Sequence, residues 1–170
     1  MNHAAAQKIV YIDLDNTLAD FGAYVASGQV TESQLAQSDG NYDEIPGIFA
    51  KFDPVPGAVA AFHELAAHFD VYILSTAPWN NPSAWSDKLE WVKRHFGDEI
   101  GKPPYKRVIL SHHKHLNHGD YLIDDRHQHN GSDKFTGELI HFATEQFPDW
   151  DAVLAYLIPA LPENDNGRRR

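Results

Sequence analysis

Five short apolar runs, rich in Ile, Val, Leu and Tyr, recur along this chain of 170 residues. Most of them are nearly continuous, whereas a strand with one solvated face alternates apolar and polar residues. Nearly continuous runs are typical of strands in a parallel sheet that is covered on both faces. The predicted strands are residues 8–14, 71–76, 107–111, 121–125 and 138–142.

Helical periodicity separates several of these runs. Apolar residues recur at helical spacing after Pro56-Gly57, after Pro82 and after Asp149, which is suited to an N-cap. The second of these helices is expected to end at Gly97. The apolar stripes consist of Val59, Phe62, Ala66 and Phe69, then Trp85, Leu89, Val92 and Phe96, then Trp150, Val153, Leu154 and Leu157. Strands and helices in alternation predict an α/β fold with a doubly wound parallel sheet.

Residues 21–55 interrupt the alternation. This segment is rich in glycine, shows weak periodicity and contains one short helical stretch near residues 31–38. We predict that it is a small cap inserted between the first strand and its crossover helix. The core domain then comprises residues 1–20 and 56–160. Residues 161–170 are polar and aperiodic, and we expect them to be disordered.

The composition argues against several classes of protein. No apolar run reaches the roughly 18 residues of a membrane span, and the N-terminus lacks the pattern of a secretory signal. Cysteine is absent, which favours a cytoplasmic location. The formal net charge of −10 disfavours binding to duplex nucleic acid. A small phosphorylated ligand is compatible with this charge if a cation reverses the local field.

Polar side chains follow three predicted strands at the point where each strand ends. Asp13 and Asp15 end the first strand, Ser75-Thr76 the second and Asp124-Asp125 the fourth. The carboxyl ends of parallel strands share one edge of the sheet, where ligands of open α/β sheets bind. We therefore expect the two early aspartates to face the two late ones, although 111 residues separate Asp13 from Asp124.

Four carboxylates in one pocket raise each other's pKa unless a counter-charge is present. Mg²⁺ is suited to this task because it takes oxygen ligands and retains phosphate oxygens in its shell. A hydroxyl of Ser75 or Thr76 can donate to phosphate, and Lys88 and Lys114 are candidates for a positive charge on the same group. The residues thus predict a Mg²⁺-dependent phosphoryl-transfer site.

The order of these motifs resembles a known family. DxDxT after an apolar strand, a Ser/Thr that closes a second strand, a lysine and a run ending in DD form the pattern of the haloacid dehalogenase-like phosphatases. The segments DLDNTLADF, FDPVPGAVAAF, VYILSTAP, DKLEWVKRHFG and YLIDDR resemble the 5'(3')-deoxyribonucleotidases of the cytosolic and mitochondrial type. The resemblance spans roughly residues 8–157. It implies a Mg²⁺-dependent phosphomonoesterase that hydrolyses nucleoside monophosphates.

The resemblance also implies which residues carry the reaction. Asp13 would be the nucleophile that forms an aspartyl-phosphate. Asp15 would be the general acid that protonates the leaving oxygen and then the base that activates water. Asp15 would also ligate the metal through its backbone carbonyl. The complete set of metal ligands would be Asp13, Asp15, Asp124 and Asp125.

The residues that bind the substrate follow from the same resemblance. Ser75 and Thr76 would bind phosphate, Thr17 would steady the loop, and Phe21 would contact the base. Both Lys88 and Lys114 match lysines of the family. Which of these two lysines neutralises the phosphoryl group stays open.

Other readings of the substrate and the class stay open. The cap of vertebrate members carries an aromatic cluster that stacks the base, whereas the cap here offers Phe21, Tyr24, Tyr42 and Phe49. A reduced cap suits broader substrates, so a phosphatase of sugar phosphates is one alternative. A receiver-type signalling domain is another, although its acidic and lysine residues follow a different order. A catalytically silent binding module is a third. A homodimer is one alternative for the oligomeric state.

Several further residues have structural interpretations. Asp20 is expected to cap a helix rather than to bind a metal. The segment SHHKHLNHGD follows no ligand spacing of zinc or nickel sites, so a solvated loop is expected there. His127 and His129 closely follow the DD pair and are candidates for the pocket wall. The tryptophans of the helical stripes are expected to pack inside: Trp85, Trp91 and Trp150.

Overall fold

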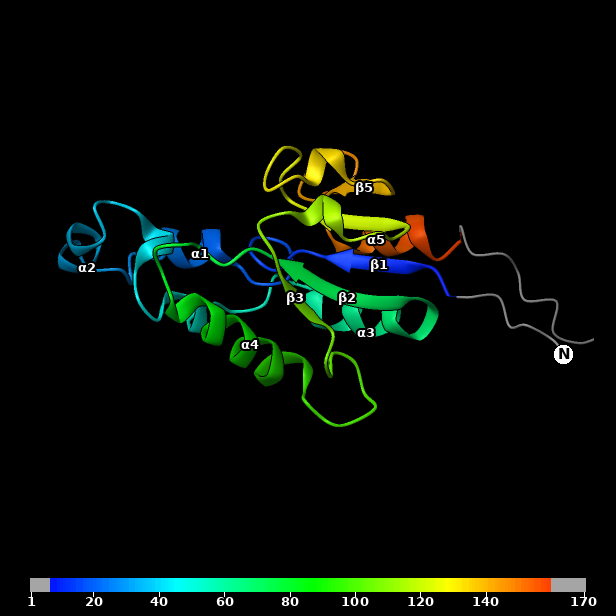
Figure 1. Ribbon diagram of the computed structural model, residues 1–170, viewed down its shortest axis with the longest axis horizontal. Coiled ribbons are helices and arrows are strands. Elements are labelled where there is room, and N and C mark those ends of the chain that lie inside the picture. The colour runs from blue at the N-terminus through cyan, green and yellow to red at the C-terminus, as the bar shows by residue number, and fades with distance from the viewer. Residues whose placement is uncertain (1–6, 160–170) are drawn as a thin grey trace, which may run out of the picture.

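A five-stranded, all-parallel sheet forms the centre of the computed structural model, which describes residues 7–159 (Figure 1). The strand order is β3-β2-β1-β4-β5. This arrangement confirms the predicted α/β fold. The predicted disordered tail, residues 161–170, lies outside the described residues. The strands are β1 (Ile9–Ile12), β2 (Asp70–Ser75), β3 (Val108–Leu110), β4 (Tyr121–Asp124) and β5 (Glu138–His141).

Three longer helices accompany the sheet: α3 (Ala58–His68), α4 (Ser83–Phe96) and α5 (Trp150–Leu157). As predicted, α4 ends at Gly97, whose φ of 89° suits a residue without a β-carbon. The side chain of Asp149 accepts a hydrogen bond from the Ala152 amide at 2.9 Å, so the predicted N-cap of α5 is confirmed.

The predicted inner face of α4 is partly wrong. Trp85 is 42% exposed and Leu89 is 40% exposed, whereas Lys88 and Trp91 are fully buried. The helix turns Lys88 inward because polar groups at the end of β2 and after β1 bind its ammonium group. Apolar periodicity cannot anticipate a buried lysine, because lysine is almost never buried without a partner.

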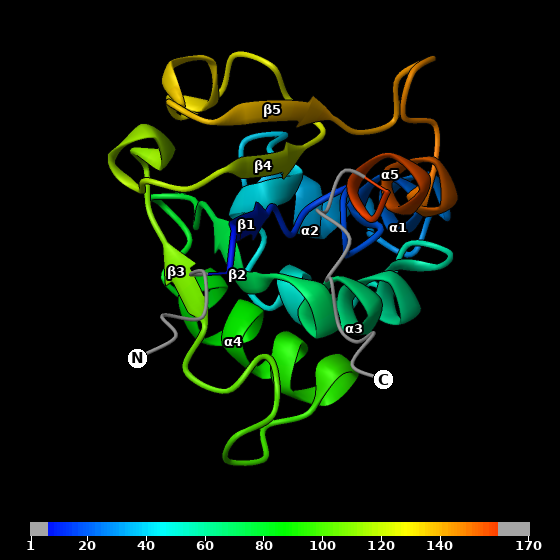
Figure 2. The ribbon, with the colours of Figure 1, turned by 90° about the vertical axis from the view of Figure 1, so that its right-hand side faces the viewer.

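The two faces of the sheet are covered unequally. Val10 and Ile12 of β1 share one large apolar cluster with residues of α3, α4 and α5, and Figure 2 shows α3 and α5 on the same side of the sheet. On the other face, Tyr11 belongs to a small cluster that Phe135 closes. The strand order changes direction at β1. Beyond that point, the connections to β4 and β5 contain only the 3₁₀ turns η3 (Lys114–Leu116) and η4 (Ser132–Lys134).

The segment between β1 and α3, residues 21–55, is called the cap segment below. It extends beyond the carboxyl ends of the strands (Figure 1). Asp20 caps its first helix by accepting from the Ala23 amide at 2.9 Å, as predicted. A capping box formed by Thr31 and Gln34 starts the second helix. Its elements are α1 (Phe21–Ala26), α2 (Glu32–Gln37), η1 (Tyr42–Glu44) and η2 (Ile48–Ala50).

Side chains of the α4 region anchor the cap segment. The buried amide of Asn81 donates to the carbonyl oxygens of Asp43 and Ile45, at 2.9 and 3.0 Å. The indole of Trp91 donates to the carbonyl oxygen of Phe52 at 2.8 Å. Arg94 likewise donates to the carbonyl of Ala50 at 3.0 Å. Residues 43–52 are therefore tied to the core, whereas α2 lies at the far tip in Figure 1.

Within residues 7–159, no helix combines the length and the apolar character that crossing a lipid bilayer requires.

Candidate active site

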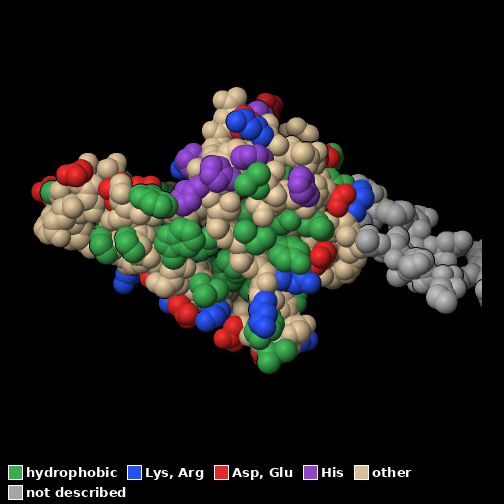
Figure 3. All heavy atoms as spheres, in the orientation of Figure 1, with side chains coloured by type: hydrophobic (Ala, Val, Ile, Leu, Met, Phe, Trp, Pro, Cys, Tyr) green, Lys and Arg blue, Asp and Glu red, His purple; other side chains and the backbone are tan. Residues whose placement is uncertain are grey.

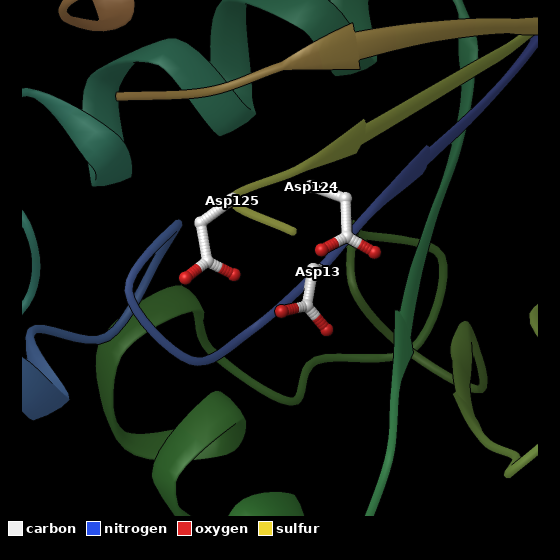
Figure 4. Close-up of side chains that lie close together, drawn as sticks. All are labelled: Asp13, Asp124 and Asp125. Atoms are coloured by element: carbon white, nitrogen blue, oxygen red, sulfur yellow. The ribbon is translucent and has the colours of Figure 1, made fainter. Parts of the chain in front are cut away.

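Strand pairing brings the two acidic motifs together. Ile12 of β1 pairs with Ile123 of β4, so the next residue on each strand is an aspartate. Asp13 and Asp124 are 6% and 1% exposed, and with Asp125 they offer carboxylate oxygens that all lie within 4.8 Å of one another. Figure 4 shows the three carboxylates converging beyond the ends of β1 and β4. The convergence expected from the sequence is therefore present.

Lys114 lies between two of these carboxylates. Its ammonium donates to Oδ1 of Asp13 at 2.8 Å and to Oδ2 of Asp124 at 2.6 Å. Only 2% of the residue is exposed. Burial opposes the charged form of this lysine, but the two carboxylates outweigh burial and raise the pKa of Lys114. Lys114 therefore carries a permanent positive charge at the acidic edge.

Lys88 binds the remaining aspartate of the DxD motif. Its ammonium forms an ion pair with Oδ2 of Asp15 and donates to the Ser75 hydroxyl at 3.1 Å. It also donates to the carbonyl of Thr76 at 2.7 Å and lies 4.4 Å from the centre of the Phe49 ring. Lys88 therefore fixes the Asp15 carboxylate relative to the end of β2.

Burial raises the pKa of several carboxylates at this edge. For Asp15, burial outweighs the lowering effect of Lys88, and the charge of Asp13 adds to the rise in pKa. For Asp124, burial and then the charge of Asp13 raise the pKa. For Asp125, burial together with Asp13 and Asp124 raises the pKa to about 6. Neighbouring acids whose pKa values are raised are typical of catalytic and metal sites.

A cavity of about 330 Å³ opens onto these groups. Its volume lies in the range of small-molecule sites. The ends of the strands form its inner wall, and the cap segment and the loop after β2 form its outer part. The lining residues from these two outer regions are Phe21, Asp43, Glu44, Phe49, Pro78, Trp79 and Asn80.

Comparison with known proteins identifies the family. The model of the family described as "5' nucleotidase, deoxy (Pyrimidine), cytosolic type C protein" matches residues 29–147. A protein of Vibrio phage KVP40 is 56% identical over 151 residues, which cover 89% of this chain and 85% of that protein. A Staphylococcus aureus protein is 32% identical over 164 residues, with 86% of each chain covered. Both relatives bear the name "Putative 5'(3')-deoxyribonucleotidase".

The chain belongs to the cytosolic type C 5'-nucleotidase family. This family is haloacid dehalogenase-like, as the resemblance implied. The parallel sheet of this chain, with aspartates at its carboxyl edge, agrees with a haloacid dehalogenase-like fold. The family assignment excludes the receiver-type interpretation, as the order of the motifs had indicated.

The residues predicted from the sequence divide into two groups within this nucleotidase fold. Thr17, Ser75 and Lys88 are fully buried and lie behind the cavity wall. The carbonyl of Thr17 accepts from the Trp150 indole at 3.0 Å, which suits a residue that steadies the loop. The predicted residues that line the cavity are Asp13, Asp15, Phe21, Thr76, Lys114, Asp124 and Asp125.

Thr76 lies on the wall, but its hydroxyl is already engaged. It donates to the Ser111 carbonyl at 2.8 Å and accepts from the Asn130 amide at 2.9 Å. The hydroxyl therefore positions Asn130, which also lines the cavity. The hydroxyl proton of Thr76 is engaged by the Ser111 carbonyl and is therefore not available for a ligand.

The sequence interpretation missed several lining residues because they come from aperiodic loops. Asn16 is one: its φ of 57° is a left-handed conformation that asparagine tolerates, and its Oδ1 accepts from the Gly22 amide at 2.8 Å. Trp79 is another, and it is 82% exposed at the cavity. No periodic signal marks such residues. The other missed members of the lining are Asp43, Glu44, Pro78, Asn80, His112, Arg126 and Asn130.

Only some of the histidines reach the cavity wall. They gather in a band on the face of the molecule in Figure 3. His112 and His129 line the cavity, whereas His127 does not. Apart from Asp13, Asp124 and Asp125, no three His, Cys, Asp or Glu side chains of residues 7–159 bring ligand atoms within 4.8 Å of one another.

The expected packing of the tryptophans holds in part. Trp91 and Trp150 are buried, at 0% and 1% exposure. Trp85 is on the outer surface of α4 and is absent from the cavity lining.

Proposed function

We propose that the protein is a Mg²⁺-dependent phosphomonoesterase that hydrolyses nucleoside monophosphates. The observation that carries the proposal is the convergence of Asp13, Asp124 and Asp125 beside the buried Lys114, at the floor of a cavity of suitable size. Family membership and the names of the relatives support a nucleotide substrate.

The acidic edge fits a hard divalent cation. The ligand atoms of the trio are carboxylate oxygens, which Mg²⁺ prefers, and no soft ligand lies among them. Asp13, Asp124 and Asp125, with the backbone carbonyl of Asp15, would hold the ion. When bound, Mg²⁺ would neutralise charge on the phosphoryl oxygens. The raised pKa values of Asp124 and Asp125 indicate that these carboxylates need such a counter-charge to be ionised together.

The proposed reaction has two steps that use two aspartates. An oxygen of Asp13 attacks phosphorus, and the ester bond between phosphorus and the leaving oxygen breaks. Asp15 gives its proton to that oxygen, which its raised pKa supports. Asp15 then takes a proton from water, whose oxygen attacks the aspartyl-phosphate. Inorganic phosphate leaves, and Asp13 is restored.

The two lysines have different positions, which supports different roles. Lys114 lines the cavity beside Asp13, so we assign it to the charge of the phosphoryl group. Lys88 lies behind the wall and binds Asp15, so we assign it to the orientation of the general acid. Ser75 supports Lys88, since its hydroxyl accepts from that ammonium group.

We propose that residues 21–55 act as the cap of this site, with Phe21, the first residue of α1, contacting the substrate. The domain division given above follows from that role. The cytoplasmic location and the oligomeric state stay predictions.

A Mg²⁺-dependent substrate screen tests the proposal. We expect the release of phosphate from deoxynucleoside 5'-monophosphates, and its loss in EDTA. Asp13→Asn is expected to lower kcat by at least about 10³-fold, because an amide cannot replace the nucleophile. Asp20→Asn is the matched control, since asparagine caps a helix as well as aspartate does and Asp20 is outside the cavity lining.

Two results would contradict the proposal. Full activity of Asp13→Asn would exclude Asp13 as the nucleophile. A clear preference for sugar phosphates over every nucleotide would favour the broad-specificity phosphatase and reject the nucleotidase.

A further inference from the structure

Asn130 lies on the cavity wall, where hydrogen bonds hold it from two sides. Its side-chain amide donates to Oγ1 of Thr76 at 2.9 Å. Its main-chain carbonyl accepts from the main-chain amide of Lys114 at 2.8 Å. Thr76 and Lys114 line the cavity as well. Asn130 is therefore held between the end of β2 and the lysine assigned to the charge of the phosphoryl group.

The hydrogen bonds around Thr76 determine which end of the Asn130 amide faces it. The carbonyl of Ser111 can only accept, so the Thr76 hydroxyl donates its proton there. The hydroxyl oxygen of Thr76 is then the acceptor, and the atom of Asn130 that faces it is the amide nitrogen. That nitrogen carries a second proton, which makes no hydrogen bond with residues 7–159. This second N–H is available to a ligand in the cavity.

The loop that carries Asn130 is fixed by its own contacts. Asn130 has a φ of 50°, a left-handed conformation that asparagine tolerates, and Gly131 follows with a φ of 82°. A β-carbon on Gly131 would clash with the ring of His115, so glycine is needed there. The buried hydroxyl of Ser132 donates to the Arg126 carbonyl at 2.9 Å and closes the loop. A donor on such a loop loses little freedom when it binds a ligand.

We propose that Asn130 binds the phosphoryl group by donating its second N–H to a phosphoryl oxygen, and that Thr76 is a positioning residue for Asn130. Lys114 supplies positive charge to the same group from beside Asp13. Asn130 adds a neutral donor with a fixed direction. A hydrogen bond to a charged oxygen is stronger than one between neutral groups. The inference rests on the proposed phosphatase function and adds a residue of the loop after β4 to its phosphate site.

Inorganic phosphate tests the contact directly, because it has neither a sugar nor a base. In the presence of Mg²⁺, phosphate should inhibit the hydrolysis of deoxyuridylate competitively. Asn130→Gly removes the amide and suits the left-handed backbone, and it should raise Ki for phosphate about tenfold. Asn130→Asp keeps the size of the side chain but replaces the donor with a carboxylate, so it should raise Ki further.

Asn117→Ala is the matched control. The side-chain amide of Asn117 donates to the Lys114 carbonyl at 3.2 Å, but Asn117 is outside the cavity lining. This variant also removes an amide that binds the backbone of Lys114, and it should leave Ki for phosphate unchanged.

A double-mutant cycle tests whether Thr76 acts through Asn130. Thr76→Val removes the hydroxyl and should raise Ki for phosphate, because Asn130 loses its acceptor. In combination with Asn130→Gly it should cause no further rise, since the residue that it positions is already missing. Thr76→Ser keeps a hydroxyl and should retain the wild-type Ki.

The outcomes separate this contact from the proposed function. An unchanged Ki in Asn130→Gly, with hydrolysis of deoxyuridylate intact, would overturn the contact and leave the phosphatase in place. A higher KM for deoxyuridylate with an unchanged Ki for phosphate would place Asn130 at the sugar and overturn it equally. Effects of Thr76→Val and Asn130→Gly that multiply would refute the positioning role of Thr76. If no phosphomonoester is hydrolysed in Mg²⁺, both proposals fall.

Discussion

Lys88, within α4, and Asp15, in the loop after β1, form an ion pair, and this pair makes the pH dependence of the reaction testable at the scale of single residues. The positive charge of Lys88 lowers the pKa of Asp15 against the larger effect of burial. Removing the charge in Lys88→Met should therefore raise the pKa of Asp15. The protonated form of Asp15 then persists to higher pH, so the alkaline limb of the plot of kcat/KM against pH should shift to higher pH.

The control for this experiment is on the same helix. Lys93→Met removes an exposed ammonium that pairs with Glu90, and its pH profile should match that of the wild type. If the alkaline limb of Lys88→Met stays at the same pH or shifts to lower pH, the role given to Lys88 is contradicted.

Asp125 links pH to stability. Its pKa is raised from 3.8 to about 6 in the folded protein. Between these values the folded state keeps a proton that the unfolded chain has lost, so the free energy of unfolding falls as the pH rises. The Asp125→Asn variant has no carboxyl at this position, so its free energy of unfolding does not fall with pH for this reason. In EDTA, its Tm relative to the wild type should therefore be higher at pH 7 than at pH 4.5.

Added Mg²⁺ should lower the Tm of Asp125→Asn relative to the wild type at pH 7, because only the wild type retains the full ligand set and a ligand stabilises the state that binds it. Asp133→Asn, an exposed carboxylate of η4, controls for the loss of one charge. A constant difference in Tm across the pH range would show that Asp125 does not titrate as described.

The convergence of the acidic residues was predictable from the sequence, whereas the mouth of the cavity was not. Asp13 and Asp124 end apolar strands, and strand ends are determined by patterns that are visible in the chain. Trp79 and Asn80 belong to a loop, where position depends on contacts with a distant segment. The hydrogen bond from Asn80 to Glu44 of the cap segment carries no periodic signal in the sequence.

At the scale of elements, α4 fixes the cap segment by means of buried hydrogen bonds. Asn81, just before α4, is 1% exposed and donates to two carbonyl oxygens of the cap segment. Asn81→Ala should lower the free energy of unfolding by about 1–3 kcal/mol, because the carbonyls of Asp43 and Ile45, the second of them buried, would lose their donor. Urea denaturation measures this loss.

Asn41 provides the matched asparagine for that measurement. It precedes η1, is exposed and makes no capping hydrogen bond with its side chain. Asn41→Ala should change the stability by less than about 0.5 kcal/mol. Equal effects of the two substitutions would refute the anchoring role of Asn81.

Helix existence was easier to predict than helix rotation. The start of α5 and the end of α4 follow from Asp149 and Gly97, which act locally. The inner face of α4 depends instead on Lys88, whose burial is stabilised by Asp15, 73 residues earlier in the chain. A local apolar stripe contains no information about that partner.

At the scale of the whole molecule, the net charge of −10 opposes the approach of an anionic substrate. Salt screens this repulsion, with a Debye length of about 10 Å at 0.1 M. At saturating Mg²⁺, kcat/KM for a nucleotide should therefore rise about twofold between low and physiological salt. A fall in kcat/KM would show that local attraction by Lys114 and Arg126 outweighs the overall charge.

The parallel sheet and the meeting of distant motifs were predictable because neighbouring strands end at one edge. The unequal cover of its faces was not, since it depends on the short connections that follow β3 and β4. Phe135, from one of these connections, closes a face that a helix was expected to cover.

The bonds from Asn81, Trp91 and Arg94 to the cap segment all end on main-chain oxygens. Such attachments do not depend on which side chains the cap segment carries. The exposed residues of the cap segment that face the cavity, such as Asp43, can therefore be exchanged while the backbone stays in place. A chain built in this way can acquire new substrates by point mutation without redesigning its scaffold.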